Sequence, residues 1–331
     1  MTKQTPKENP QGGKLFLVDG HSFCYRAFYA IPNLTNSKGE PTNAIYGFVT
    51  MIRRLMEEQK PDHVAMCFDR KEPTFRHEQY KDYKAHRKPM PEELVSQIEP
   101  IKEFCRISNW AILEKAGYEA DDVIGTLAKQ GEKQGYQVFI ITGDKDAFQL
   151  VNEKVKILQP HKENLVYDRE KVRERFSGLG PEKVVDVLAL MGDASDNIPG
   201  VPGIGEKTAI KLVQEFGSVS GLLERIEEVG SEKQRQKIQE NVEDLKMSQR
   251  LATIDTNVPL EIDWEAIRVT EPDNAALAEF FKRYEFRGLL KSVAVQGEKE
   301  TKDRDYKTIQ TAQQLKVFAG ELKEAKAFSF D

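Results

Sequence analysis

Five short apolar runs punctuate the first half of the chain, at residues 15–18, 64–68, 110–113, 138–141 and 155–158. They are continuous rather than alternating, which is typical of parallel strands that are buried on both faces. Between them, residues 44–59, 91–106 and 121–133 have apolar side chains at helical spacing. Strands that alternate with helices predict an α/β fold with a mostly parallel central sheet flanked by helices.

The pattern changes after about residue 178. Residues 181–191, 206–216 and 231–252 are predicted to be helical, and the run 289–295 is predicted to form a last strand. We therefore expect a disordered lead-in at 1–13, an α/β domain at 14–178 and a helical subdomain at 179–296. A charged linker would follow at 297–305. Residues 306–331 begin as strand, helix, strand and stop with the core unfinished, so we expect the incomplete start of a further domain.

Composition narrows the class of protein. The chain has 331 residues and a net charge of −5, which argues against coating nucleic acid by bulk charge but permits a local basic patch. No apolar run approaches the ~20 residues of a membrane span, and the N-terminus lacks the apolar core of a secretory signal. We expect a cytoplasmic protein without a membrane segment. The three cysteines predict buried thiols rather than a disulfide framework or a zinc site.

Acidic residues follow the predicted strands. Because the carboxyl ends of parallel strands meet at one crevice, four strands bring seven acids to the same edge of the sheet. These are Asp19, Asp69, Glu119, Asp121, Asp122, Asp144 and Asp146. The segment LMGDASDNIPG adds Asp193 and Asp196, which are spaced to share one helical turn. A single aspartate after a strand is usually a turn residue or a helix N-cap, so only the whole set indicates a site.

The repulsion within this set points to bound cations. Two carboxylates about 4 Å apart repel by about 4 kcal/mol at an effective dielectric constant near 20. The neighbouring basic residues are few and lie mostly on another segment. Mg²⁺ and Mn²⁺ prefer oxygen ligands, and the number of acids suits two ions. Paired ions serve in-line phosphoryl displacement, so the pattern predicts phosphodiester or phosphate-ester chemistry.

Residues 70–91 combine cations with aromatic side chains and directly follow Asp69. The segment contains seven Lys and Arg against three acids, with Phe75, Tyr80 and Tyr83 interleaved. Such a composition suits a single nucleic-acid strand, although a solvated helix face is an equally ordinary interpretation. If the segment is helical, Lys84 and Arg87 face the same way. Its position above the acidic edge favours contact with a substrate.

A glycine-rich turn, Gly200, Gly203 and Gly205, precedes a helix that begins near Glu206. It nearly matches a nucleotide-binding P-loop, but Glu206 stands where the lysine belongs and no strand precedes it. We interpret G-x-P-G-x-G-x-K-[TS], which ends at Lys207 and Thr208, as a helix–hairpin–helix. Its backbone could approach a phosphate without reading base sequence, whereas the alternative is a plain turn between helices.

Six segments in order resemble the flap endonuclease / 5′→3′ exonuclease family, which forms the 5′ nuclease domain of bacterial DNA polymerase I. They are LVDGHSFCYRAFYAIP, TNAIYGF, TFRHEQYKDYKAHR, YEADDVIGTLA, TGDKDAFQL and LMGDASDNIPGVPGIGEKTA. The resemblance covers about residues 15 to 295 and implies a PIN-like α/β fold with a helical arch. The last segment is similar to the start of that polymerase's 3′→5′ exonuclease-like domain, which implies neither proofreading nor polymerase activity for this chain.

The resemblance also assigns roles to the candidate residues. All nine acids would surround two or three divalent ions, Mg²⁺ or Mn²⁺. Lys84 and Arg87 would contact the scissile phosphate under the arch. The positions expected to contact DNA are Arg26, Arg76, Tyr83, Gly200, Gly203, Gly205, Lys207 and Thr208. The hairpin would grip duplex DNA and hold K⁺. The implied substrates are 5′ flaps, nicks and RNA-primer junctions in replication and repair, with polymerase domains in the full-length protein and the nucleoid as the place of action.

Two other functions stay open at this point. An Asp-x-Asp phosphatase on an α/β sheet could use Asp144 and Asp146, but it would leave the hairpin and the basic segment without a purpose. A catalytically silent binder of DNA structures would need neither the acids nor a metal. A small phosphate ester tests the first alternative, and insensitivity of binding to chelation tests the second.

Overall fold

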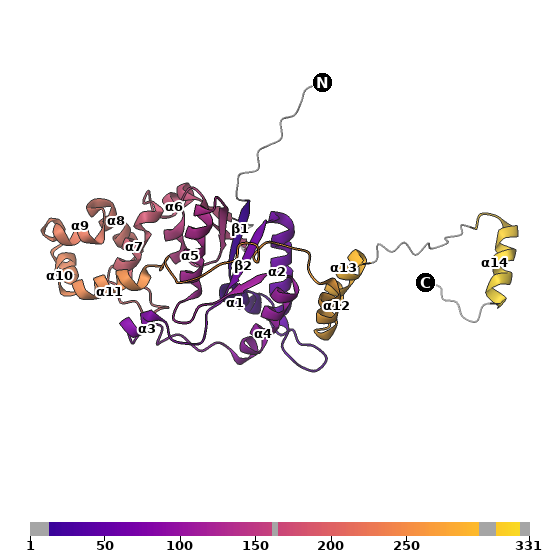
Figure 1. The fold of residues 1–331 in the computed structure, drawn as a ribbon. Coiled ribbons are helices and arrows are strands. Elements are labelled where there is room, and N and C mark those ends of the chain that lie inside the picture. The colour runs from indigo at the N-terminus through magenta and orange to yellow at the C-terminus, as the bar shows by residue number, and fades with distance from the viewer. Residues whose placement is uncertain (1–12, 161–164, 298–308, 325–331) are drawn as a thin grey trace, which may run out of the picture.

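The computed structural model describes residues 13–160, 165–297 and 309–324. Figure 1 shows an α/β body with a group of helices on one side and the hairpin of α12 and α13 on the other. Residues 1–12 and 298–308, which carry most of the predicted lead-in and linker, lie outside the described residues. The predicted helix after the linker is present as α14 (Ala312–Glu324). The strands predicted around it lie almost wholly outside the described residues.

One six-stranded sheet organises the body, in the order β3-β2-β1-β4-β5-β6. Its strands are β1 (Lys14–Asp19), β2 (His63–Cys67), β3 (Ala111–Leu113), β4 (Gln137–Ile141), β5 (Val155–Gln159) and β6 (Leu165–Tyr167). Strands β1 to β5 pair in parallel, and β6 runs antiparallel to β5. The mostly parallel sheet predicted from the apolar runs is therefore confirmed. The order reverses direction between β1 and β4, and this is where a crevice opens at the carboxyl ends of the strands.

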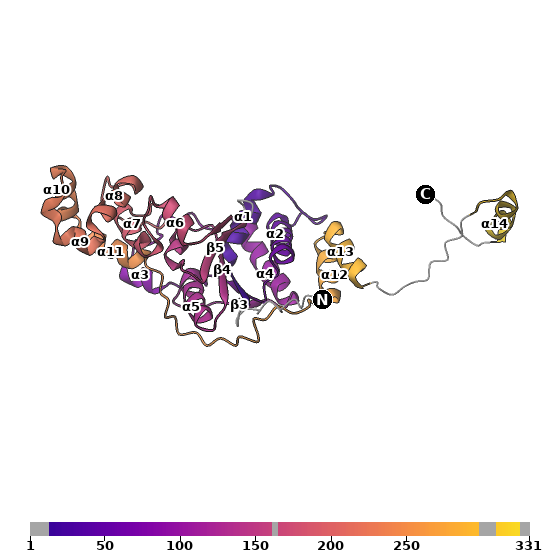
Figure 2. The ribbon, with the colours of Figure 1, turned by 90° about the horizontal axis from the view of Figure 1, so that it is seen from above.

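Both faces of the sheet are buried, which explains the continuous apolar runs. Leu15 and Leu17 of β1 belong to one hydrophobic core, and Phe16 and Val18 belong to the other, as the alternation of side chains along a strand requires. Figure 2, viewed from above, shows helices on both sides of the strands.

Helices of the first half cover the two faces in separate groups. The second core contains α1 (Gly20–Ala30), α2 (Asn43–Gln59) and α4 (Glu92–Ile107), whereas the first contains α5 (Ala120–Lys133). The shorter elements are α3 (Phe75–Gln79), the 3₁₀ helix η1 (Asp146–Leu150) and α6 (Arg169–Arg175). The predicted helices at 44–59, 91–106 and 121–133 are confirmed in α2, α4 and α5. Helix α1 and strand β6 were not predicted.

The second half is helical as far as Ala252. Its elements are η3 (Pro181–Lys183), α7 (Val184–Met191), α8 (Glu206–Phe216), α9 (Val219–Glu224), η4 (Ile226–Glu228), α10 (Glu232–Glu240) and α11 (Val242–Ala252). The prediction that residues 231–252 are helical is confirmed, in two helices rather than one, because the chain breaks at Asn241 between α10 and α11. There the Asn241 side chain donates a hydrogen bond to the Lys237 carbonyl oxygen, at 2.7 Å, in competition with the helical pattern.

The prediction of a strand over 289–295 was wrong. These residues belong to α13 (Arg287–Gly297), which pairs with α12 (Asn274–Arg283). Leu289, Leu290 and Val293 pack against the second core at helical spacing, so the apolar run has the period of a helix face.

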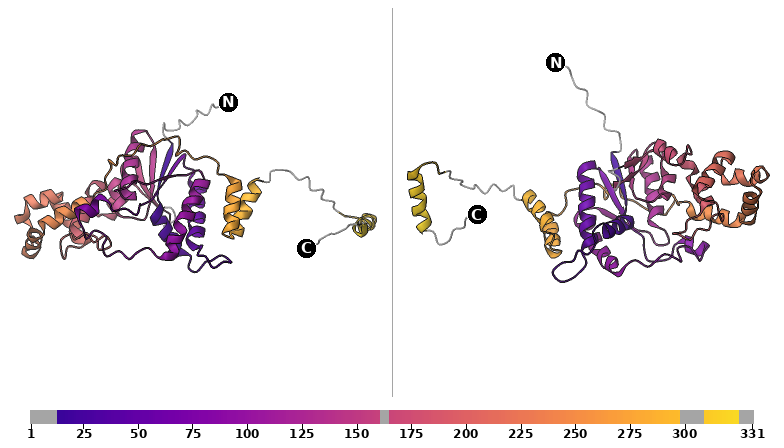
Figure 3. Two further views of the ribbon diagram at one scale, coloured as in Figure 1. Left: turned by 60° about the horizontal axis from the view of Figure 1, so that its bottom comes forward. Right: turned by 180° about the vertical axis from the view of Figure 1, so that it is seen from behind.

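The chain returns to the α/β body after the helical part. An extended strap, residues 253–273, runs from α11 to α12, and Figure 3 shows α12 and α13 on the side of the body away from α8–α11. The strap hydrogen bonds to β2, where the Val64 N–H donates to the Ile267 carbonyl at 2.8 Å. Phe280 and Phe281 then pack with Phe104 of α4. The region predicted as a helical subdomain at 179–296 thus includes two helices that share a core with the α/β part.

Within the described residues, we find no helix that combines the length and the apolarity needed to cross a membrane.

Candidate active site

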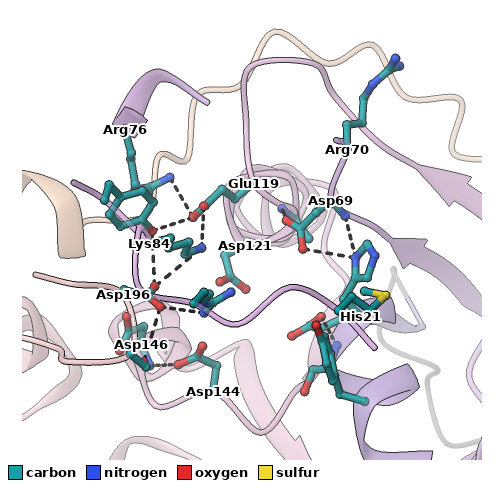
Figure 4. A pocket seen from close by; sticks show the side chains of 18 of the residues that line it. His21, Asp69, Arg70, Arg76, Lys84, Glu119, Asp121, Asp144, Asp146 and Asp196 are labelled. Carbon is teal, nitrogen blue, oxygen red and sulfur yellow. Dashed lines mark hydrogen bonds and ion pairs between the residues drawn. The ribbon is translucent and has the colours of Figure 1, made fainter. Parts of the chain in front are cut away.

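Eight of the nine predicted acids line one pocket at the carboxyl ends of the strands. The pocket has a volume of about 1240 Å³ and is lined by Asp19, Asp69, Glu119, Asp121, Asp144, Asp146, Asp193 and Asp196, among other residues. Asp19 is the last residue of β1, and Asp144 follows β4, so the two strands on either side of the topological reversal both contribute an acid to the pocket. Figure 4 shows Asp121 in the middle of this arrangement, with Asp69 and Asp196 on opposite sides and Asp144 beside Asp146 below it.

Local hydrogen bonds hold several acids in place. Asp19 is the N-cap of α1, because its Oδ1 accepts from the Ser22 N–H at 3.0 Å, and its Oδ2 accepts from the Thr142 hydroxyl at 2.9 Å. Glu119 is the N-cap of α5. Asp69 accepts from the Ala120 N–H at 2.8 Å. The ordinary interpretation of these residues as caps and turn residues is therefore correct for their local role, and it is compatible with a shared site.

Burial and mutual repulsion raise the affinity of the central acids for protons. Burial, together with Asp144, raises the pKa of Asp146 to about 8. Burial, with the charge of Asp69, raises the pKa of Asp19 to about 6. Burial and the neighbouring Asp144 raise the pKa of Asp121 well above its usual range. The Oδ1 of Asp146 is buried with no hydrogen-bond partner among the described residues. This anionic, partly unsatisfied set of hard oxygen ligands fits a divalent cation.

A second subset of the acids is already paired with basic side chains. Lys84 Nζ lies 2.6 Å from Glu119 Oε1 and 3.6 Å from Asp196 Oδ2. Arg87 contacts Asp196 at 2.7 Å, and Lys145 contacts Asp193 at 2.9 Å. Burial lowers the pKa of Lys84, but Glu119 and Asp196 outweigh this effect and raise it, so the ammonium is charged at neutral pH. The basic residues thus neutralise more of the acidic rim than the sequence indicated.

The structure does not place Asp122 among the candidate metal ligands. Its carboxylate is fully buried and is held by the Arg76 guanidinium, at 2.6 Å and 2.8 Å. It also accepts from the N–H groups of Glu119 and Asp255. Both of its oxygens are therefore satisfied by the protein, outside the pocket lining.

Two residues that were expected to contact DNA are buried. Arg76 is 2% exposed, and besides Asp122 it binds the carbonyl oxygens of Leu251 and Thr253 at 3.0 Å and 2.8 Å. Tyr83 is 3% exposed, and its hydroxyl donates to Glu119 at 3.0 Å. The expectation of direct DNA contact is not met by Arg76 in this structure, because its guanidinium is consumed by these bonds. Through this hydrogen bond, Tyr83 of the basic segment holds the Glu119 carboxylate in place.

Other expected contacts lie at the pocket, together with residues that sequence reasoning missed. Arg26 of α1 lines the pocket, and its Nη1 is buried without a partner among the described residues. His21 was missed. Its Nδ1 lies 3.0 Å from the Asp69 backbone nitrogen and 3.2 Å from the Asp69 carboxylate. Lys145 was missed too, although its place between Asp144 and Asp146 was a visible signal.

The basic segment, residues 70–91, is not one continuous helix. It contains the short α3 followed by turns over 81–86, and Lys84 has a positive φ of 57°. Lys84 and Arg87 nevertheless reach the same carboxylate, Asp196, as Figure 4 shows for Lys84. Arg70, at the start of the segment, points away from the acids in that view.

The glycine-rich turn forms a hairpin that leads into α8. Gly205 is the N-cap of α8, and Gly203, Gly205 and Lys207 are exposed. Thr208 is partly exposed on the first helical turn. Gly200 is buried with a φ of 59°, close against Gly192. The hairpin therefore presents backbone and a helix N-terminus to solvent, as a phosphate contact requires.

No three histidine, cysteine or acidic side chains in the described part of the chain are arranged to hold one ion together. The reason is physical: like-charged carboxylates separate, and three of them turn to Lys or Arg. The acids surround a shared pocket instead.

Two family models match the chain. The model described as the 5′–3′ exonuclease N-terminal resolvase-like domain matches residues 14–177. The model described as the 5′–3′ exonuclease C-terminal SAM fold matches residues 179–275. The chain belongs to the 5′–3′ exonuclease family. The resemblance stated from the sequence motifs is confirmed. The pocket is lined mostly by the resolvase-like domain of this exonuclease family, and the C-terminal domain contributes Asp193 and Asp196 to it as well as the hairpin.

Two relatives are similar to this chain in sequence. The thermostable DNA polymerase I of Thermus thermophilus is 46% identical over 290 residues, which cover 88% of this chain and 34% of the polymerase. The DNA polymerase I of Bacillus subtilis is 41% identical over 318 residues, covering 95% of this chain and 36% of the polymerase. The chain thus spans about a third of the length of these relatives.

A solved structure shows the same fold for this exonuclease-family chain. The flap endonuclease of bacteriophage T5, in a complex with DNA and metal ions, has a TM-score of 0.63 and is 22% identical. The match covers 86% of this chain and 100% of the phage protein. At this identity the likeness establishes the fold alone.

Proposed function

We propose that the chain is a divalent-metal-dependent 5′ nuclease. It cleaves phosphodiesters at 5′ flaps, nicks and primer ends of branched duplex DNA and leaves 5′ phosphates. The observation that carries the proposal is the pocket where acids from β1, β2, β4 and the loop before α5 converge beside Lys84 and Arg87. Membership of the 5′–3′ exonuclease family supports it.

The candidate ligands are the eight predicted acids that line the pocket. Asp19, Asp69, Asp121, Asp144 and Asp146 have no Lys or Arg ion pair among the described residues. Glu119, Asp193 and Asp196 would join them when their basic partners move. We favour Mg²⁺ or Mn²⁺, as two or three ions, since all donors are carboxylate oxygens. Bound ions would supply an activated water and charge neutralisation at the phosphate.

The protein's own residues would orient the substrate. Lys84 and Arg87 carry positive charge at the pocket, where they would stabilise the charge that develops on the phosphate oxygens. The Nη1 of Arg26 is buried without a hydrogen-bond partner among the described residues, so it would donate to a phosphate oxygen. The exposed hairpin at Gly203 and Gly205, with Lys207 and Thr208, would hold duplex phosphates by backbone and helix-end contacts, and K⁺ would bind there.

The relatives suggest a role for the full-length protein. We propose that the full-length protein carries polymerase domains, as the DNA polymerase I relatives suggest by length and name. The nuclease would then remove RNA primers and flaps during replication and repair, in the cytoplasm at the nucleoid.

One experiment tests the proposal. The purified chain is incubated with end-labelled 5′-flap, nicked and single-stranded DNA, in Mg²⁺ and in EDTA, with a small phosphate ester in parallel. We expect Mg²⁺-dependent release of the flap and no turnover of the small ester. Turnover of the ester without DNA cleavage would favour the phosphatase, and EDTA-insensitive binding without any cleavage would favour the silent binder.

A further inference from the structure

We propose that Lys84, Arg87 and Lys145 act as stand-in cations in the metal-free protein, and that a later-binding divalent ion must displace them. Displacement of Lys84 and Arg87 releases the basic segment, residues 80–90, from the loop that carries Asp193 and Asp196. This inference rests on the proposed metal-dependent function and adds an order of events to it. It concerns how the segment above the pocket becomes free to engage DNA.

The acids divide into two groups by their partners. The first group has no Lys or Arg within ion-pair distance among the described residues and consists of Asp19, Asp69, Asp121, Asp144 and Asp146. The second group is Glu119, Asp193 and Asp196, and each of its members is paired with a basic side chain at 2.6–2.9 Å. An ion can enter the first group without moving any Lys or Arg.

Entry into the second group is different. A hard cation sits about 2.0–2.6 Å from its carboxylate oxygens. Lys84 Nζ already lies 2.6 Å from Glu119 and 3.6 Å from Asp196, so the ion and the ammonium would lie only a few ångströms apart. At that separation their repulsion is too large for both to stay, because the pocket is partly shielded from water. The ion that carries two charges replaces the ammonium that carries one.

The backbone extends the effect from side chains to the whole segment. The Lys84 N–H donates to the Asp196 carbonyl at 2.9 Å, and the Asn197 side chain donates to the Asp82 carbonyl at 2.7 Å. Together with the Lys84 and Arg87 ion pairs, these bonds fasten the segment to the loop after α7. Lys84 also has a positive φ of 57°, which a residue with a side chain adopts only where surrounding contacts hold it. Loss of the ion pairs leaves these two hydrogen bonds, a 3.4 Å bond from the Tyr83 hydroxyl to Asp196 and the packing of Tyr83 with Ile198 to hold a strained turn.

The first test measures Mn²⁺ binding by electron paramagnetic resonance, which counts free ions and needs no DNA. We compare the wild type with the double variant Lys84→Met, Arg87→Met. The matched control is Lys71→Met, Lys102→Met, which removes two charges from the same pocket lining. Lys102 pairs with Glu114 rather than with a candidate ligand.

The expected result is that the weakest-bound ion binds about tenfold tighter in the double variant, because a competing positive charge is gone. The tightest ion and the control variant should change by less than about threefold. Unchanged affinity of the weakest ion in the double variant overturns the inference. Absence of Mn²⁺ binding in the wild type contradicts the proposed function itself, so the two failures are distinct.

The second test uses only the wild type, so it does not depend on a variant that folds. Hydrogen–deuterium exchange is followed with and without saturating Mg²⁺. Peptides over residues 80–90, which include the Lys84 amide, should exchange several-fold faster when Mg²⁺ is present, whereas peptides from α2 should not change. Equal or slower exchange over residues 80–90 with Mg²⁺ would show that the segment stays fastened and would refute the displacement.

Discussion

Arg76 and Asp122 form a bidentate ion pair with donor–acceptor distances of 2.6 Å and 2.8 Å, and the two residues are 2% and 0% exposed. Arg76 comes from α3 at the base of the basic segment, whereas Asp122 lies in the first turn of α5. Arg76 also binds the carbonyl oxygens at the end of α11. One guanidinium therefore joins three parts of the fold.

This pair predicts a stability difference between two aspartates that look alike in the sequence. Asp122→Asn removes the closer of two carboxylates that pair with the buried Arg76, leaving Glu119 at 3.5 Å, and should lower the free energy of unfolding by about 3 kcal/mol. Urea denaturation of the metal-free protein measures it. Asp144→Asn is the matched control, since it relieves repulsion in the pocket and should cause no loss of stability. Equal stability of the two variants would contradict the structural role assigned to Asp122.

Asp146 predicts how the stability of the metal-free protein depends on pH. Burial, together with Asp144, raises its pKa from 3.8 to about 8, so the folded state holds a proton that the unfolded chain releases. The stabilisation is complete below about pH 4 and is lost as pH rises through about 8. In EDTA, Asp146→Asn should therefore melt at a higher temperature than the wild type at pH 9, with a smaller gap at pH 5. Calorimetry at both values checks this.

Two neighbours complete the pH argument. Asp19, with a pKa of about 6, acts in the same direction as Asp146 and is present in both proteins, so the comparison cancels it. Burial tends to raise the pKa of Asp69, but the hydrogen bond and charge of His21 outweigh it and lower the pKa to about 2. Its contribution is lost only as pH falls through about 2, outside the tested range. A gap that widens toward pH 5 would overturn the prediction.

Replacing Lys84 should affect the rate of cleavage more than the affinity for DNA. With flap DNA in Mg²⁺, Lys84→Ala should slow single-turnover cleavage by about 10²-fold, because a cation that stabilises the developing phosphate charge is lost. The dissociation constant for the same DNA in Ca²⁺ should change by less than about threefold, since many phosphate contacts share the binding energy. Lys102→Ala, in the same pocket, serves as the control. A larger effect on binding than on the rate would assign Lys84 to docking.

Replacing two glycines of the hairpin should have different effects, one on stability and one on DNA binding. Gly200 has a φ of 59°, and an added Cβ would meet Gly192 backbone atoms at 2.4 Å, so Gly200→Ala should cost about 1–3 kcal/mol of unfolding free energy. Gly205 has open space around an added Cβ and a φ of −92°. Gly205→Ala should therefore fold normally yet bind duplex DNA several-fold more weakly, because the methyl group keeps a phosphate at a distance. Wild-type DNA binding by Gly205→Ala would remove the hairpin from the interface.

The sheet and most of the pocket were predictable because both follow from short-range patterns. Buried parallel strands leave continuous apolar runs, and the acids come directly after them, so position along the chain predicts position in space for Asp19 and Asp144. The helix over 289–295 was mistaken for a strand because a short apolar run carries little information about period. The break at Asn241 depends on one side-chain hydrogen bond, which composition does not reveal.

The sequence alone could not show which basic side chain each acid pairs with. Whether an aspartate faces the pocket or a buried arginine depends on contacts between segments far apart in the chain. Asp121 and Asp122 are adjacent, yet one lines the pocket and the other is bound by Arg76, 46 residues away. Likewise, the pairing of Lys145 with Asp193 brings together two loops from different domains. Local spacing indicates which residue types are available, and tertiary packing decides which of them stay exposed to a ligand.

The strap over residues 253–273 makes the helical region an insertion between two stretches of the α/β body rather than an appendage to it. Phe280 and Phe281 pack against Phe104. A truncation that stops at Ala252 would therefore expose an apolar surface and promote aggregation. A shortened version of this chain should therefore keep the residues through α13, even though every candidate ligand lies before residue 197.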